Sequence, residues 1–480
     1  IRRPPRSTLS SSSAASDVYK RQTTDKARTW QPLAESRGRG PWGRPDTISH
    51  VACSADEPPA VFVGASTGVW ASLDACRTWQ KILDGNCSGI QVLSDGTAYA
   101  VAAGVLYRWT VGLGQPARVE AQGIPSAVTA LAIGGTAKEH TIHAVAGGNV
   151  HTSTDSGKSW RRSFAQQGIV DVVMARNQQL AAYACDYMNV YVTRDAGASW
   201  KSTFELGRNA PNTWIQREMH WGYYIVKFGL GCGQGNPEIV TMSTQAELFV
   251  SNDYGATWDA RHSRELGRMP DGGGERLQSV GLEVTSTWDY FIDPHEPNRH
   301  YVGFSDIGLC RSVDGGATWS WAARGSPWGN TFYDIAFDPF QRGKLFAAAS
   351  GLHEIIHWIG NMSGGNQHSR GGMVVSEDYA RSWRPLEGLP VAPCTSVKVD
   401  VKNSRPGAVV LFAAVWGHGV YKSVDSGASW THKPGVGRPG NLHVFRLRIH
   451  PKTNDLYVNV SGARQGSAFP VPGGLWKSSD

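Results

Sequence analysis

Short apolar segments of strand length alternate with polar, glycine-rich turns along the chain. Residues 68–72 (GVWAS), 189–193 (NVYVT) and 419–423 (GVYKS) combine β-branched and aromatic residues, which is typical of strands. The longest apolar run, residues 408–416, is shorter than the roughly 18 residues that a membrane helix needs. The pattern therefore predicts an all-β protein without a membrane span.

One motif recurs along most of the chain. Its pattern is Ser/Thr-x-Asp-x-Gly-x-Ser/Thr-Trp, and we call it the box. Full copies lie at residues 153–160, 193–200, 251–258, 312–319 and 423–430, and copies without the glycine lie at 23–30, 72–79 and 376–383. Such self-similarity indicates a repeat architecture.

The residue types of the box suit a tight hairpin turn. An aspartate carboxylate can accept hydrogen bonds from backbone N–H groups across the turn, and glycine can adopt the left-handed conformation. The tryptophan ring can pack between neighbouring sheets. We therefore expect a structural role, not a catalytic one, for the box residues Asp155, Asp195, Asp253, Asp314, Asp378 and Asp425.

The box resembles the Asp box, or BNR repeat. This repeat occurs in sialidases, the luminal domain of sortilin, a photosystem II assembly factor and the xyloglucan-degrading glycoside hydrolases of family 74. The resemblance covers nearly the whole chain after residue 22 and implies a β-propeller of four-stranded antiparallel blades. A shared fold of this kind says little about function.

The spacing of strands and boxes sets the expected number of blades. Complete units are expected to begin near residues 48, 88, 127, 169, 215, 284, 331 and 394, with partial units at both ends of the region 23–480. The unit at 89–110 lacks a box. This count fits one large propeller of about ten blades or parts of two seven-bladed propellers. The chain ends on Ser478-Ser479-Asp480, the start of another box, so we expect a fragment.

Residues 1–22 are serine-rich and basic, unlike the rest. They resemble translated sequencing-adapter sequence, and we interpret them as an artefact or a disordered tail. They carry part of the net charge of +7, so the charge of the remaining residues does not suggest nucleic-acid binding.

The seven cysteines follow no metal-binding spacing, and no cofactor is expected. We expect an extracellular or periplasmic location, with no signal peptide in this fragment.

Chemistry is expected on the face opposite the boxes, where long loops connect the blades. Two kinds of loop are expected on this face: those between the last strand of one blade and the first strand of the next, and those between the second and third strands of a blade. The long ones lie near 205–222, 263–283, 351–372 and 461–473. Asp289 and Asp334 align at the start of the first strand of their units, as does Asp171. Neighbouring acids raise one another's pKa, which suits a general acid; alternatively, each caps its own loop.

Asp306 is the candidate general acid. The run Asp306-Ile307-Gly308 resembles the Asp-Ile-Gly-Gly turn of the family 74 hydrolases, whose aspartate is one of two catalytic carboxylates. Leu309 and Cys310 depart from that pattern, and the second carboxylate of the family belongs to another propeller. Asp289 or Asp334 is the expected partner here, and an inverting mechanism needs the carboxyl groups roughly 6.5–9.5 Å apart. The alternative is that Asp306 only stabilises its turn.

Residues 353–357 (HEIIH) match the zinc-binding pattern HExxH. That chemistry needs both histidines on one face of a helix, and a helix is not expected in this loop. His353 and His357 are therefore weak metal candidates, and the alternatives are contacts with a polar ligand or a solvated loop.

Aromatic residues and one arginine complete the expected site. Flat rings can stack on sugar faces, although packing between blades is an equally good explanation for each ring. The candidate substrate-binding residues are Trp221, Trp288, Tyr290, Trp328, Trp358 and Arg446.

Two functions remain open. The first is a carbohydrate-active propeller that cleaves a polysaccharide or oligosaccharide with two carboxylates, as the resemblance to family 74 implies. The second is a non-catalytic propeller that binds a protein or peptide, as in sortilin or the assembly factor. A sialidase is less favoured because the Arg-Ile-Pro segment of that family is missing.

Overall fold

The computed structural model describes most of the chain after residue 46. The described residues are 21–22, 31–32, 47–54, 59–112, 114–120, 122–123, 127–136, 138–211, 213, 225–244, 247–280, 286–352, 355, 370–465 and 468–479. Strands dominate these ranges, in which the helical elements are α1 (Leu206–Asn209) and a 3-10 turn at Val401–Asn403. The strands β1 (Arg21–Gln22) and β2 (Gln31–Pro32) form a small separate sheet.

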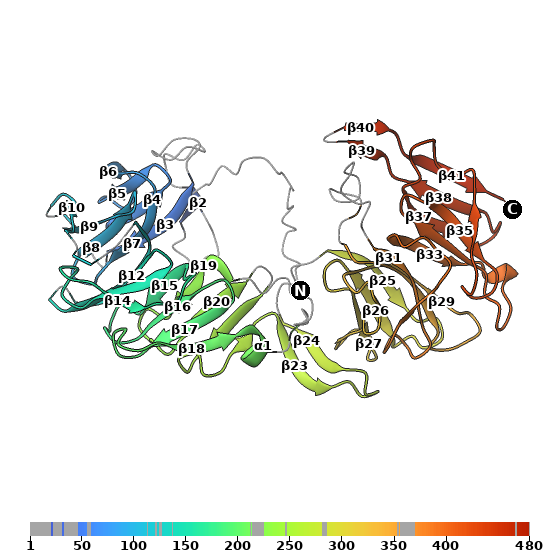
Figure 1. Cartoon of the computed structure of the whole chain (residues 1–480), viewed down its shortest axis with the longest axis horizontal. Helices are drawn as coiled ribbons and strands as arrows, with labels where there is room; N and C mark the ends of the chain where they lie inside the picture. Colours follow the sequence, from blue (N-terminus) through green and yellow to red (C-terminus); the bar gives the residue numbers. More distant parts are fainter. Residues whose placement is uncertain are drawn as a thin grey trace. The chain divides into compact units, whose positions relative to one another are not determined.

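The chain divides into two compact units, coloured from blue to green and from yellow-green to red in Figure 1. Unit 1 comprises Ile1–Ala210, Tyr224–Thr244 and Phe249–Trp258, and unit 2 comprises Pro211–Tyr223, Gln245–Leu248 and Asp259–Asp480.

Unit 1 holds all or nearly all of the first five blades, each a four-stranded antiparallel sheet. The blades are β3 (Ile48–Cys53), β4 (Val61–Ala65), β5 (Gly68–Ser72) and β6 (Gln80–Asp84); β7 (Cys87–Val92), β8 (Thr97–Ala102), β9 (Val105–Thr110) and β10 (Ala117–Arg118); β11 (Val128–Gly135), β12 (His140–Ala146), β13 (Asn149–Ser153) and β14 (Arg161–Phe164); β15 (Asp171–Met174), β16 (Ala182–Cys185), β17 (Asn189–Thr193) and β18 (Lys201–Glu205); and β19 (Ile225–Cys232), β20 (Val240–Thr244), β21 (Leu248–Ser251) and β22 (Asp259–Ala260).

Unit 2 begins with a hairpin and continues with blades. The hairpin is β23 (Ser263–Arg268) and β24 (Glu275–Ser279). The blades are β25 (Thr287–Ile292), β26 (His300–Phe304), β27 (Leu309–Ser312) and β28 (Ser320–Trp321); β29 (Thr331–Phe337), β30 (Leu345–Ser350), β31 (Gly371–Ser376) and β32 (Arg384–Pro385); β33 (Cys394–Val399), β34 (Leu411–Val415), β35 (Gly419–Ser423) and β36 (Thr431–Lys433); and β37 (Val444–Ile449), β38 (Leu456–Val460) and β41 (Gly474–Ser478), with β39 (Ala463–Gln465) and β40 (Ala468–Val471) paired beside them.

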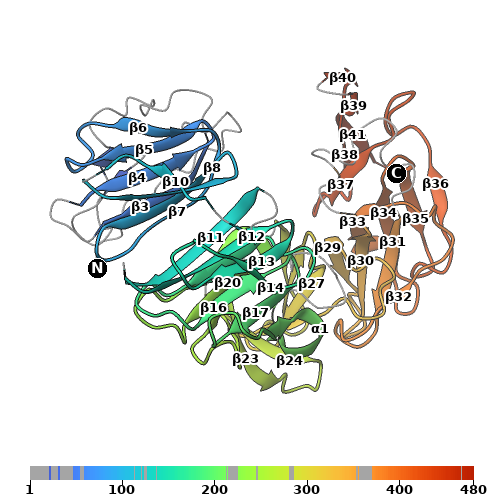
Figure 2. The same ribbon diagram turned by 60° about the vertical axis from the view of Figure 1, so that its left-hand side comes forward.

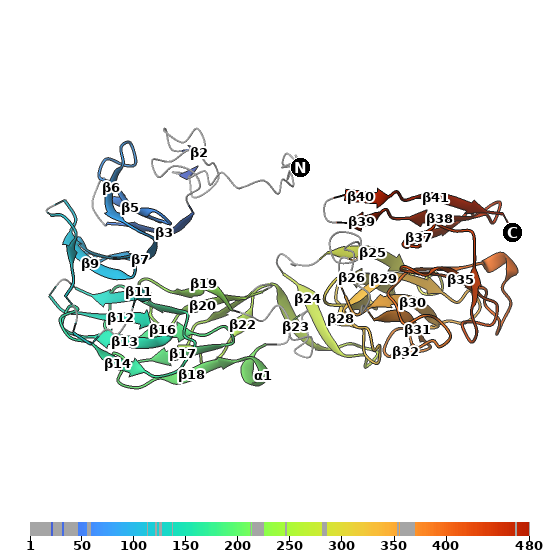
Figure 3. The same ribbon diagram turned by 45° about the horizontal axis from the view of Figure 1, so that its top comes forward.

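In eight of the described blades four strands follow one another in chain order, so the predicted four-stranded antiparallel blades are confirmed, while the last sheet has the order β37-β38-β41. Figure 3 shows β11 to β14 lying in order across their sheet. First strands of successive blades contact one another, from β3 through β7, β11 and β15 to β19 in unit 1, and from β25 through β29 and β33 to β37 in unit 2. Figure 2 shows the blade β3–β6 next to the blade that contains β7 and β8.

Most first strands carry a β-bulge near their start. The register shifts, for example, between Cys87 and Gly89, between Thr287 and Asp289, and between Phe332 and Asp334. A bulge leaves one extra residue outside the ladder and re-aims its side chain. In the second blade that residue is Ser88, whose hydroxyl donates to the Val128 carbonyl of the next first strand at 2.9 Å. The bulge residue is thus a link between blades.

The box closes the hairpin between the third and fourth strands. Asp155 shows its geometry: the carboxylate accepts from the Ser159 amide at 3.0 Å, from the Ser159 hydroxyl at 2.5 Å and from the Ser153 hydroxyl at 2.8 Å. These bonds, led by the one from the Ser159 hydroxyl, lower the pKa of Asp155 to about 2. The carboxylates of Asp195, Asp253, Asp314, Asp378 and Asp425 are held in the same way.

One predicted loop is a regular element instead. The stretch 263–283, expected as an irregular connection between blades, contains the hairpin β23–β24. No helix in the described ranges has the length and apolarity needed to cross a membrane.

Candidate functional site

The turn between β26 and β27 holds Asp306 in a strained backbone conformation. Asp306 has φ +69° and Gly308 has φ +73°. The left-handed region disfavours most side chains but tolerates aspartate better than most. The Phe304 amide donates to the Gly308 carbonyl at 2.8 Å, and the Gly308 amide donates to the Asn330 carbonyl at 3.0 Å. The turn is therefore fixed both within itself and to the segment before β29.

The first strand of the same blade reaches this turn through Trp288. Trp288 is the bulge residue of β25, and its indole N–H donates to the Ser305 hydroxyl at 2.7 Å. Asp289 follows directly, half-buried, and its carboxylate accepts from the Tyr290 amide at 3.0 Å. The structure thus brings Asp306, Trp288 and Asp289 to one end of one blade, opposite the box.

Arg446 ties this end to two further strands. Arg446 is the residue directly after the bulge of β37. Asp289 in β25 and Asp334 in β29 hold the same register position. The Arg446 guanidinium donates to the Tyr333 carbonyl at 2.8 Å and to the Trp288 carbonyl at 3.4 Å. Arg446 therefore positions the backbone beside Trp288 as well as bringing a positive charge to this end of unit 2.

Bulge residues of three first strands form an aromatic cluster that sequence reasoning missed. The ring centroids of Trp288 and Tyr333 lie 4.9 Å apart, and Phe445 lies 5.9 Å from Trp288 and 6.1 Å from Tyr333. Trp416 packs on Phe445 and stacks on His443. An aromatic residue at a bulge position was the signal that could have revealed the cluster.

The equivalent bulge residue in other blades is hydroxylated. Ser49, Ser88 and Thr395 each donate to a carbonyl at the start of the next first strand. In β25, β29 and β37 a ring replaces that hydroxyl and packs on the other rings. The result is a cluster of packed rings near the starts of these three strands, with Tyr333 fully buried and Trp288 partly exposed.

Asp334 is placed differently from the prediction that it acts with Asp306. Its side chain is fully buried. The carboxylate accepts from the Ser396 hydroxyl at 2.5 Å, from the Val397 amide at 3.1 Å and from the Lys398 ammonium at 2.7 Å. A general acid must reach its substrate, so these contacts make Asp334 an anchor between β29 and β33 instead.

Two aromatic candidates have their contacts elsewhere in the blades, and one of them, Tyr290, is 47% exposed. The Tyr290 hydroxyl bonds to His300 at 2.5 Å, and its ring lies edge-on to the box residue Trp319, toward the box end of the blade. Trp328 packs against Gly372 of β31, where a Cβ atom would lie 2.4 Å from the indole. Neither ring lies among the contacts of Asp306 or Asp289 described above.

The remaining candidates lie outside the described residues. They are Trp221, Trp358, His353 and His357. Among the residues that the structure describes, no group of three or more His, Cys, Asp or Glu side chains could hold a metal ion.

Comparison with known proteins gives distant relatives. No family model matches the chain. The chain is 24% identical over 242 residues to an oligoxyloglucan-reducing end-specific xyloglucanase of Emericella nidulans, covering 48% of this chain and 25% of the relative. It is 26% identical over 171 residues to a probable enzyme of the same name from Neosartorya fischeri, covering 34% and 17%. The chain thus spans a quarter or less of the length of these curated relatives.

Among solved structures, an ancestral GH74 enzyme superposes with a TM-score of 0.64 over 93% of this chain and 67% of that structure, at 14% identity. The fold is that of a β-propeller. The predicted fold class is therefore confirmed. At this level of identity the likeness concerns the fold, and the activity must be argued from the site.

Proposed function

We propose that this chain belongs to a carbohydrate-active Asp-box propeller that hydrolyses glycosidic bonds in a polysaccharide or oligosaccharide. The observation that carries the proposal is the turn of Asp306, held in the left-handed conformation beside Trp288 and Asp289. The two curated relatives, both named as xyloglucanases, support a xyloglucan-type substrate. A polymeric substrate agrees with an extracellular or periplasmic location.

In this proposal Asp306 protonates the leaving-group oxygen. Asp289, on the adjacent first strand, is the second carboxylate contributed by this chain, and it activates water or stabilises the oxocarbenium-like transition state. Trp288 orients the turn through its bond to Ser305 and offers an aromatic face to a sugar ring. Arg446 keeps the β25 backbone in place through the Trp288 carbonyl.

The test is hydrolysis of xyloglucan oligosaccharides and other β-glucans, with products read by mass spectrometry. We expect wild-type protein to cleave a glycan and Asp306→Asn to reduce kcat by about 10²-fold or more, the usual share of a general acid. Asp259→Asn, which removes an exposed carboxylate of unit 2, is the matched control and should keep wild-type activity. Absence of turnover by the wild type on every glycan would favour the non-catalytic binding function instead.

A further inference from the structure

The box tryptophan fills the interface with the preceding blade. Trp200 stacks on Phe164 of β14, with centroids 5.4 Å apart and planes 20° apart. Trp258 lies edge-on to Phe204 of β18 and donates its indole N–H to the Thr203 carbonyl at 3.0 Å. Trp383 repeats the contact in unit 2, since its N–H donates to the Ala322 carbonyl at 2.6 Å. An indole ring is thus a standard part of these interfaces.

The blade β7–β10 lacks a box. Between β9 and β10 the chain runs through Gly112, Gly114 and Pro116 instead of the box residues. No box tryptophan of this blade is therefore available to fill its interface with the blade β3–β6. Trp109 of β9 supplies a ring from a different position, 5.6 Å from Phe62 of β4.

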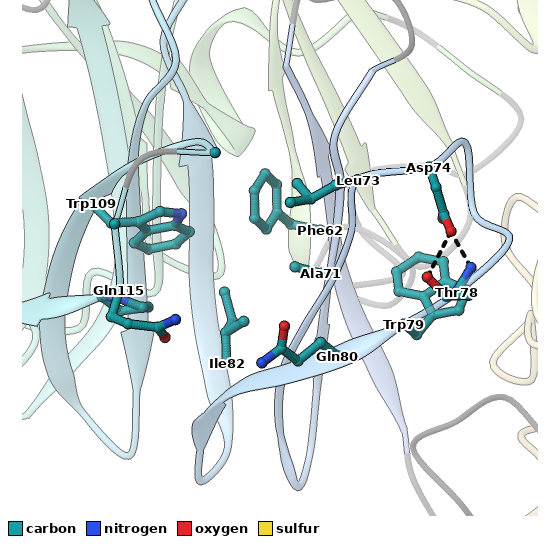
Figure 4. Close-up of a pocket in the computed structure, with 13 residues that line it drawn as sticks. Phe62, Ala71, Leu73, Asp74, Thr78, Trp79, Gln80, Ile82, Trp109 and Gln115 are labelled. Atoms are coloured by element: carbon teal, nitrogen blue, oxygen red, sulfur yellow. Dashed lines mark hydrogen bonds between the residues drawn. The ribbon is translucent and has the colours of Figure 1, made fainter.

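A cavity of about 460 Å³ remains at this interface. Figure 4 shows Phe62, Ala71, Ile82 and Trp109 around an open centre, with Leu73 above. The carboxamide side chains of Gln80 and Gln115 line the same cavity, and both residues are exposed. A volume of this size falls within the roughly 300–1,000 Å³ of small-molecule sites, and the exposed rim opens it to solvent.

The acceptor of the Trp258 indole has a counterpart in the blade β3–β6. Thr203 is the bulge residue of β18, because the register shifts between the pairs Val190–Phe204 and Tyr191–Ser202. Ile82 holds this position in β6, between the pairs Val69–Leu83 and Trp70–Lys81. Its carbonyl therefore occupies the place that accepts an indole N–H from Trp258 in the other interface.

The lining of the cavity favours a neutral ligand. Asp74 is the one charged residue among those that line it. Its carboxylate already accepts from the Thr78 hydroxyl at 2.6 Å, from the Thr78 amide at 2.9 Å and from the Ser72 hydroxyl at 2.8 Å. An anionic ligand would meet no positively charged partner, whereas a flat apolar ring would bury its faces against Phe62, Ile82 and Trp109.

We propose that the cavity between the blades β3–β6 and β7–β10 binds an indole ring, whose N–H donates to the carbonyl of Ile82. The ligand class is a neutral planar aromatic compound with one edge donor, either a free indole or a tryptophan side chain. The proposal does not depend on the glycosidase function, because the cavity lies within unit 1 and Asp306 lies in unit 2.

Titration of the full chain with 5-fluoroindole, followed by fluorine NMR, tests the proposal. We expect saturable binding with a Kd of about 1 mM or tighter, reasonable for a ligand with few heavy atoms. 5-Fluoro-1-methylindole lacks the donor and should bind about three- to tenfold more weakly. Competition by N-acetyltryptophanamide shows that the site also admits a tryptophan side chain, and its failure restricts the ligand to a free indole. Non-saturable or absent binding of 5-fluoroindole overturns the proposal.

Two matched variants locate the site. Leu73 and Val424 both immediately precede a box aspartate, and they are 57% and 61% exposed, so a tryptophan at either position should not disturb folding. Leu73→Trp places a ring in the mouth of the cavity and should weaken 5-fluoroindole binding at least tenfold, while Val424→Trp should leave it unchanged. Equal binding by both variants, with wild-type thermal unfolding, would place the ligand elsewhere and refute the assignment.

Discussion

His143 is the buried titratable residue with the clearest effect on stability. It lies in β12 with no exposed surface, and its Nδ1 bonds to the Thr152 hydroxyl at 2.7 Å. That hydroxyl donates onward to Ser163 at 2.7 Å, which leaves its oxygen free to accept from Nδ1. Burial, together with the nearby charge of Arg161, lowers the pKa of His143 to about 3, from 6.5 for an ordinary histidine.

This shift predicts that unit 1 loses stability in mild acid. Between pH 6.5 and about 3 the His143 imidazole is protonated in the unfolded chain but not in the folded chain. The free energy of unfolding therefore falls as the pH drops below 6.5. At pH 5 the loss should be about 2 kcal/mol. His143→Phe keeps a ring against Trp200 and should reduce the difference between urea midpoints at pH 7 and pH 5. An identical pH dependence in both proteins would assign the effect to other groups.

At the scale of elements, an ionic network attaches the hairpin β23–β24 to the blades of unit 2. Arg311 of β27 is 1% exposed and binds both carboxylate oxygens of Asp271 at 2.7 and 2.9 Å. Arg299 also donates to Asp271, at 3.3 Å, and to Glu296 at 2.7 Å. The hydrogen bond from Arg311, more than any other contact, holds the pKa of Asp271 well below its usual range.

Asp271→Asn should therefore destabilise unit 2 strongly. The variant removes the charge that compensates a buried guanidinium, and breaking such a pair costs about 3–5 kcal/mol. Asp259→Asn is the control, since Asp259 lies 4.0 Å from Arg261 in an exposed pair and should cost about 0.5 kcal/mol or less. Denaturant unfolding measures both. Similar losses in the two variants would show that the network contributes no more than an exposed pair.

At the scale of the whole molecule, each unit has its own hydrophobic core. In unit 1 the clusters lie between successive blades. One contains Tyr99 and Trp160, and another contains Ala182 and Ala184. In unit 2 they lie around Phe346 and Leu411 and around Phe332 and Trp383. Because contacts are concentrated within each unit, we expect the two units to unfold separately.

Calorimetry of the full chain at pH 7 should therefore show two transitions. Asp271→Asn should lower the midpoint of unit 2 by about 6–20 °C and leave that of unit 1 in place, since roughly 2–4 °C are lost per kcal/mol in units of this size. His143→Phe should change only the transition of unit 1, which contains His143. A single transition that moves as a whole in Asp271→Asn would show that the units unfold together.

Much of the architecture follows from local chemistry. The hydrogen bonds of a box join residues that are close in sequence, such as Asp155 and Ser159, which differ by 4 in residue number. The motif itself therefore specifies a hairpin wherever it occurs. The observed blades begin at β7, β11, β29 and β33, within a few residues of the starts expected from strand spacing at 88, 127, 331 and 394. Sequence also singled out Asp306, through its resemblance to a catalytic turn.

Tertiary structure decided what lies next to what. Asp334 and Asp289 look equivalent in the sequence, yet only Asp334 meets Lys398, 64 residues later, because β29 and β33 become neighbours. The cluster of Trp288, Tyr333 and Phe445 likewise joins bulges of three blades. The cavity beside Trp109 lies where one blade lacks the box ring that other blades insert. Such long-range contacts depend on the packing between blades, which a repeated local motif leaves unspecified.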